Sequence, residues 1–141
     1  MARIVISGER PDEWIHFTPM PEISAISFEV TACLRGRTVS NNSLSLLGAA
    51  GFLAALVEFE RTRSGEAVLE GTYDFRLVVR PYGRTGAAWL GFRLAEDLFL
   101  EDHTYGRHVL EGGFVIPGES VGRLVLDLKG LLAQDRRGSG A

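Results

Sequence analysis

Apolar and polar residues alternate over most of this chain, and this period of two is the pattern that most restricts how it can fold. From residue 24 to residue 34 the apolar set is Ile26, Phe28, Val30, Ala32 and Leu34. Such alternation is typical of antiparallel strands that bury one face. Further strands are predicted over residues 3–7, 13–18, 37–42, 67–80, 87–94, 98–100 and 108–116. The fold is therefore expected to be built on a sheet.

Helical spacing replaces the alternation in two segments. Residues 46–63 are predicted to form a central helix with Ser45 as its N-cap and with Ser64 and Gly65 ending it. This helix is expected to contact the sheet through Leu46, Ala49, Leu53 and Leu56. Residues 121–132 carry apolar side chains at helical intervals and predict a terminal amphipathic helix.

Together these elements predict an α+β fold, in which a single antiparallel sheet of six or seven strands has two helices packed on one face. Residues 1–134 are expected to form one domain, since the chain of 141 residues lies in the single-domain range. Residues 135–141 have nothing to bury and are predicted to be a flexible tail. The uncovered face of the sheet is left for solvent or for a partner.

Charge and composition exclude several classes of protein. The 15 basic and 18 acidic side chains give a net charge of −3, which disfavours nucleic-acid binding. The single cysteine, Cys33, cannot form an internal disulfide. The apolar run over residues 44–57 is too short to span a membrane, and the first residues lack the apolar stretch of a signal peptide. A cytoplasmic protein is expected.

One acidic segment could carry chemistry. It contains Glu96, Asp97, Glu101, Asp102, His103 and His108. Such a set could bind a divalent cation or act as a general acid and base, but no calcium-loop or His-x-x-x-His spacing organises it. A solvated acidic turn is the favoured interpretation.

No other catalytic motif is present in the sequence. A nucleophilic Cys33 would need His16, His103 or His108 brought to it by the fold. Neither Gly-x-Ser-x-Gly nor a phosphate-binding glycine motif occurs. We therefore assign no catalytic, cofactor-binding or metal-binding residue, expect no cofactor, and predict a protein that is not an enzyme.

The hairpin after the central helix supplies the candidate partner-binding residues. Pairing Arg80 with Ala87 across the loop 81–86 matches the side chains on both faces. The predicted pairs are Phe75 with Phe92, Leu77 with Leu90, Val79 with Ala88, Asp74 with Arg93 and Val78 with Trp89. Arg76 is then diagonal to Trp89, so that Arg76, Trp89 and Arg93 could form a binding patch. The alternative is an ordinary solvated sheet face.

The middle of the chain resembles the WapI-type bacterial immunity proteins and related small families of unknown function. The resemblance rests on Gly-Phe-Leu-Ala-Ala-Leu at 51–56 within the helix, on Gly-Glu-Ala-Val-Leu-Glu-Gly at 65–71 and on the closing Leu-rich helix, and it covers about residues 24–134. Residues 116–120 depart from the pattern. The resemblance implies a non-enzymatic protein that binds a cognate toxin, and it transfers no site residue to this chain.

Two classes of function follow from these observations, and a third has less support. The first is a non-enzymatic binding protein of the immunity type, whose partner is a protein toxin or a second copy of the chain. The alternative is a small-molecule-binding domain with a pocket between the central helix and the sheet. The third is an enzyme that uses the segment from Glu96 to His108. The identity of the partner and the oligomeric state are left open.

Overall fold

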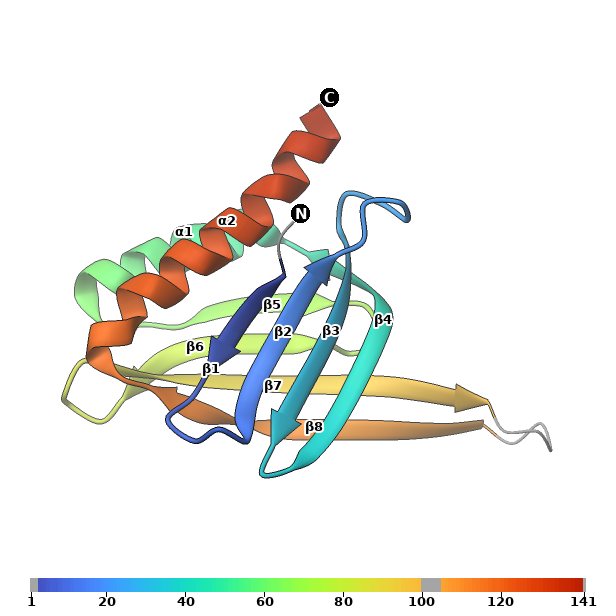
Figure 1. Ribbon diagram of the computed structural model, residues 1–141. Helices are drawn as coiled ribbons and strands as arrows, with labels where there is room; N and C mark the ends of the chain where they lie inside the picture. The colour runs from blue at the N-terminus through green and yellow to red at the C-terminus, as the bar shows by residue number, and fades with distance from the viewer. Residues whose placement is uncertain (1–2, 100–104, 141) are drawn as a thin grey trace.

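A computed structural model describes residues 3–99 and 105–140, without the side chains of Tyr105 and of residues 134–140. The chain forms one antiparallel sheet of eight strands in sequence order, together with two α-helices (Figure 1). The strands are β1 (Ile4–Ser7), β2 (Glu13–Pro19), β3 (Ser27–Leu34), β4 (Arg37–Leu47), β5 (Ala67–Gly71), β6 (Arg76–Tyr82), β7 (Ala87–Phe99) and β8 (Tyr105–Ile116). The α+β class with a single antiparallel sheet is confirmed, whereas the predicted count of six or seven strands is wrong.

The segment predicted as one long strand over residues 67–80 is a hairpin. Tyr73 and Asp74 have φ angles of 58° and 61°, and the Phe75 N–H donates to the Thr72 carbonyl at 3.2 Å. Positive φ at both central residues defines the tight turn that best matches strand twist, and Asn-Gly or Asp-Gly usually occupies it. Neither central residue is glycine, so the sequence gives no sign of a turn here. The alternation of apolar and polar residues continues through the point where the chain reverses.

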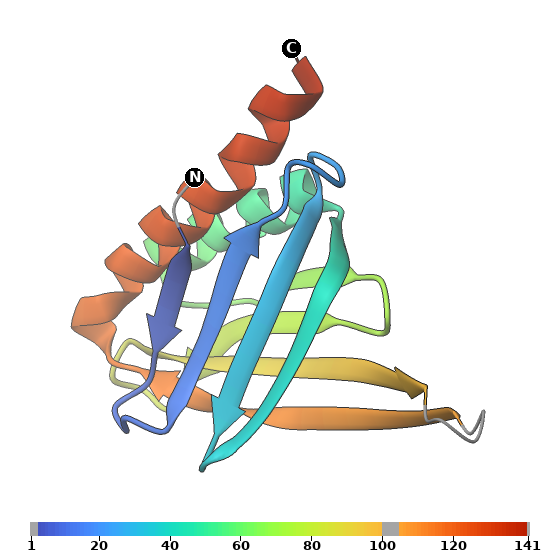
Figure 2. The ribbon, with the colours of Figure 1, turned by 45° about the vertical axis from the view of Figure 1, so that its right-hand side comes forward.

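The eight strands form two crossed layers. In Figures 1 and 2, β1–β4 run steeply in front of β5–β8, which lie nearly horizontally behind them. Only Leu46 with Gly71 and Leu47 with Glu70 join β4 to β5. The buried side chains of both layers belong to one hydrophobic cluster, and the Asn41 side-chain amide donates to the Ala95 carbonyl at 3.0 Å between β4 and β7. The inner faces of the layers therefore share one core, and the outer faces meet solvent.

The central helix, α1, is shorter than predicted and buries a different stripe. It spans Ala49–Thr62, while Ser45 and Leu46 belong to β4, so neither the predicted cap nor the predicted start is correct. Leu46 fits both patterns, since it continues the alternation of β4 and also stands at helical spacing from Ala49. In the structure it belongs to the strand. The fully buried residues of α1 are Phe52, Leu56 and Phe59. Leu53, predicted at the centre of the contact, is only partly buried.

Arg63, rather than Ser64 and Gly65, ends α1. Its φ of 55° is left-handed, and its backbone N–H donates to the Phe59 carbonyl at 2.7 Å. Its guanidinium donates to the Gly86 carbonyl at 2.7 Å. This contact ties the end of α1 to the β6–β7 turn and accounts for a conformation that usually selects glycine.

The second helix, α2 (Val121–Gly140), follows the 3-10 turn η1 (Gly118–Ser120) and lies beside α1, on the same side of the molecule (Figures 1 and 2). Its predicted apolar stripe is buried: Val121, Leu124, Val125, Leu128, Leu131 and Leu132 are each at most 3% exposed. The backbone of residues 135–140 continues the helix beyond the domain boundary expected at residue 134. The predicted flexibility of residues 135–141 stays a prediction.

The register of the β6–β7 hairpin differs from the predicted one by two residues. Tyr82 pairs with Ala87, and Arg80 with Trp89, because β6 continues through Pro81 and Tyr82. The remaining turn, residues 83–86, is closed by Gly83 and Gly86 with φ angles of 66° and 81°. The predicted pairs are all replaced, but a shift of two leaves every side chain on its predicted face.

Candidate functional site: an arginine and tryptophan surface

A row of four charged residues crosses the outer surface of β5–β8. Glu70 pairs with Arg76, Arg76 with Arg93, and Arg93 with Glu111. The two arginines at the centre of the row therefore face each other directly across β6 and β7. The structure brings together Arg76 and Arg93, two of the three predicted partner-binding residues, where the predicted register had placed Asp74 opposite Arg93.

The positive charge at the centre of this row is only partly neutralised. The closest approach of Arg93 to Glu111 is 3.8 Å, which is long for a charge-assisted hydrogen bond. Arg76 makes no ion pair or side-chain hydrogen bond with the part of the chain that the structure describes. Like charges directly opposite each other destabilise a sheet by a fraction of a kcal/mol to about 1 kcal/mol. The arrangement favours a bound anion.

Glycines form the floor next to this row. Val78 pairs with Gly91, and Gly91 with Gly113, so two of the three adjacent positions lack a side chain. Trp89 covers them: a Cβ built at Gly91 would lie 2.9 Å from the indole Nε1, and one at Gly113 would lie 2.8 Å from Trp89 Cζ2. The indole ring therefore lies along the sheet instead of projecting away from it.

Arg80 and Tyr82 complete the surface, and sequence reasoning did not select either. Arg80 is the direct cross-strand neighbour of Trp89. The rings of Tyr82 and Trp89 are stacked, with centroids 6.1 Å apart and planes at 21°. The alternation of β6 already placed Arg80 on the same face as Arg76, so the missing information was the register.

These side chains enclose an open hollow with a volume of 330 Å³. We call it the arginine hollow and define it by its lining residues, which are Arg76, Val78, Arg80, Trp89, Gly91 and Arg93 together with Glu66, Phe92, Glu111 and Gly112. The three predicted partner-binding residues all line it. Guanidinium groups around an apolar and aromatic floor can bind an acidic group that carries an apolar stem.

The acidic segment lies elsewhere, at the far end of β7 and β8. Glu96 pairs with His108, and Arg107 forms ion pairs with Asp97 at 2.9 Å and with Asp74 at 2.8 Å. Glu101, Asp102 and His103 fall outside the described residues. Within the described residues, no three histidine, cysteine or acidic side chains are grouped as metal ligands would be.

Cys33 is 6% exposed and lies opposite Trp14 in β2. His16, a base named for it from the sequence, is two residues along β2 from Trp14 and stacks on that ring at 4.2 Å between centroids. Trp14 thus lies next to both Cys33 and His16 on the outer side of β2 and β3. The surroundings are those of a packed thiol.

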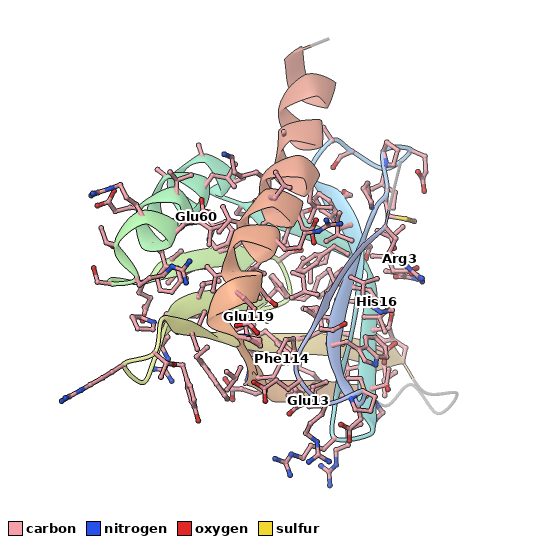
Figure 3. The ribbon with its side chains drawn as sticks, turned by 60° about the vertical axis from the view of Figure 1, so that its left-hand side comes forward. Arg3, Glu13, His16, Glu60, Phe114 and Glu119 are labelled. Carbon is pink, nitrogen blue, oxygen red and sulfur yellow. The ribbon has the colours of Figure 1, made fainter. Side chains whose placement is uncertain are left out.

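His16 predicts a measurable pH dependence of stability. Burial and, to a smaller extent, the charge of Arg3 beside it lower the pKa of His16 below 6.5 (Figure 3). The unfolded chain therefore binds this proton first, and the stability should fall as the pH drops through the unfolded pKa of about 6.5. We expect His16→Gln to remove much of the change in the free energy of unfolding, measured with urea, between about pH 7 and pH 5. Arg3→Gln should remove a smaller part of it. If the free energy of unfolding changes with pH by the same amount in the unmodified protein and in both variants, His16 is not the origin of the pH dependence.

Comparison of the chain with protein-family models, with curated proteins and with solved structures gives no match. In the described part of the chain, no helix has both the length and the apolar character needed to cross a membrane.

Proposed function

We propose that this chain is a non-enzymatic binding protein of the immunity type, which acts in the cytoplasm by binding and neutralising a protein toxin. The observation that carries the proposal is the outer surface of β6 and β7, where Arg76, Arg80 and Arg93 surround Trp89. Arginine and tryptophan are the residues most enriched among those that dominate binding energy at protein interfaces. The resemblance to WapI-type immunity proteins is in line with this function.

The proposal is tested by capturing the partner and rebuilding the complex from purified components. We expect Arg76→Glu combined with Trp89→Ala to weaken the complex by about 100-fold in calorimetry, because it removes a cation and an aromatic anchor at the centre of the surface. The matched control is Lys129→Glu with Leu126→Ala on the exposed side of α2, which should bind as the unmodified protein does.

Three results would contradict the proposal: no specific protein partner, a partner whose activity is unaffected by binding, or equal binding by the two double variants. Sedimentation of the purified protein provides a further test. If the chain forms a dimer that the Arg76→Glu, Trp89→Ala variant loses, the surface serves self-association and no toxin.

The alternative function, a small-molecule pocket between the central helix and the sheet, is less favoured by the packing. Phe28, Phe52, Phe75 and Phe92 all belong to the hydrophobic core and are each at most 4% exposed. The arginine hollow lies on the outer side of the sheet, and none of its lining residues belongs to α1. A ligand between α1 and the sheet would have to displace these rings from a packed core.

A further inference from the structure

We infer that the arginine hollow is a receptor for a single carboxylate, the side chain of an aspartate or glutamate that a partner protein inserts between Arg76 and Arg93. The inference rests on the proposed function and names the chemical group that the surface recognises. It is carried by the pairing of the two arginines, by the glycine floor and by the charge of the lining.

The arginine pair provides the cationic site. Directly opposed residues of an antiparallel pair have Cβ atoms about 5 Å apart, so both guanidinium groups can reach one carboxylate between them. Glu111 approaches only Arg93, at 3.8 Å, and leaves most of the N–H donors of both side chains free. A carboxylate bound between the arginines removes the repulsion that their placement creates.

The floor provides space and one more donor. Gly91 and Gly113 lie side by side in β7 and β8, so two of the three positions next to the arginines have no side chain, and Val78 and Trp89 border the space that this leaves. The indole nitrogen of Trp89 lies over Gly91 and has no hydrogen-bond acceptor in the described part of the chain. An indole N–H can only donate, and an incoming carboxylate oxygen is a suitable acceptor.

The charge of the lining selects a single negative charge. The hollow is lined by three arginines and two glutamates, which leaves a net charge of +1. One carboxylate neutralises it. A phosphate carries nearly two negative charges at neutral pH, and would be repelled by Glu66 and Glu111.

The size and the walls of the hollow match a side chain. A volume of 330 Å³ admits one or two side chains but no folded element. Val78 and Trp89 supply an apolar wall for the stem that carries the carboxylate. Recognition therefore combines a charged head with an apolar stem, as in interface pockets that receive a single anchoring residue.

Small probes test this receptor in the folded full-length chain. Trp14→Phe leaves Trp89 as the only tryptophan, so its fluorescence and its indole N–H resonance report on the hollow. We expect benzoate to bind with a millimolar dissociation constant and shift both signals, and benzamide, its neutral analogue, to shift neither. Arg76→Gln or Arg93→Gln should weaken benzoate binding by about tenfold, because each removes a charge-assisted contact.

Arg84→Gln is the matched control, since Arg84 lies in the β6–β7 turn and does not line the hollow. Unchanged melting temperatures establish that each variant is folded. Equal effects of benzoate and benzamide, equal losses in Arg84→Gln and Arg93→Gln, or tighter binding of inorganic phosphate would overturn the inference.

The two proposals fail in different ways. If a captured partner depends on Arg76 and Trp89 but benzoate does not bind, the binding function stands and the carboxylate receptor is wrong. If benzoate binds in an Arg93-dependent manner and no protein partner exists, the hollow binds carboxylates but the proposed function is wrong. Where a partner is captured, replacing its acidic residues by the corresponding amides identifies the inserted residue by the same tenfold loss.

Discussion

Phe59→Ala is expected to lower the free energy of unfolding by about 3–5 kcal/mol, the range for truncating a buried aromatic residue. Phe59 is 0% exposed and lies in the last turn of α1, where its carbonyl also accepts the hydrogen bond from Arg63. Truncation leaves a cavity in the hydrophobic core that the surrounding side chains can close only in part. Urea denaturation followed by circular dichroism measures the loss.

Two substitutions provide the controls for this prediction. Leu53→Ala, which the sequence pattern ranks as a core truncation, should cost less than half as much, because Leu53 is only partly buried. Leu126→Ala should change stability by less than about 0.5 kcal/mol, since the side chain is 63% exposed on α2. A larger loss for Leu53 than for Phe59 would show that the other face of α1 contacts the core.

Gly113→Ala is expected to lower stability by about 3 kcal/mol, the upper part of the range for overpacking. A Cβ at this position would overlap the Leu90 carbonyl oxygen and would lie 2.8 Å from Gly91 Cα. Both are backbone atoms of β7, so the two strands would have to separate. The same change displaces Trp89, whose Cζ2 lies 2.8 Å from that Cβ.

Gly106→Ala is the matched control in the same strand. The nearest atom to its Cβ is Leu98 Cβ at 4.0 Å, so alanine fits without strain. We expect this variant to be at least as stable as the unmodified protein, because alanine restricts the unfolded chain more than glycine does. Equal melting temperatures for the two alanine variants would mean that β7 and β8 are not as close as described.

The candidate site could be predicted only in part. Alternation in β6 and β7 assigned Arg76, Trp89 and Arg93 to one outer face, and the structure places all three around one hollow. The arrangement within that face was wrong, because it depends on a register that loop length alone does not decide. Arg76 therefore faces Arg93 rather than lying diagonal to Trp89, and Arg80 takes the position next to the indole ring.

The sequence by itself determined the elements whose side chains repeat with a clear period. The inward residues of β6 and β7 and the stripe of α2 from Val121 to Leu132 are buried as their spacing indicates. Burial of one face produces such a pattern, so the pattern predicts the face.

Only the tertiary structure decided where segments with the same period end and which strands meet. Leu46 suits a strand and a helix equally well, and its place in β4 follows from its pairing with Gly71 in β5. The turn at Tyr73 and Asp74 carries no glycine, and it is tied to β4, where the Thr72 N–H donates to the Ser45 carbonyl at 3.0 Å. Local sequence cannot encode these choices, because the stabilising partners are distant in the chain and close only after folding.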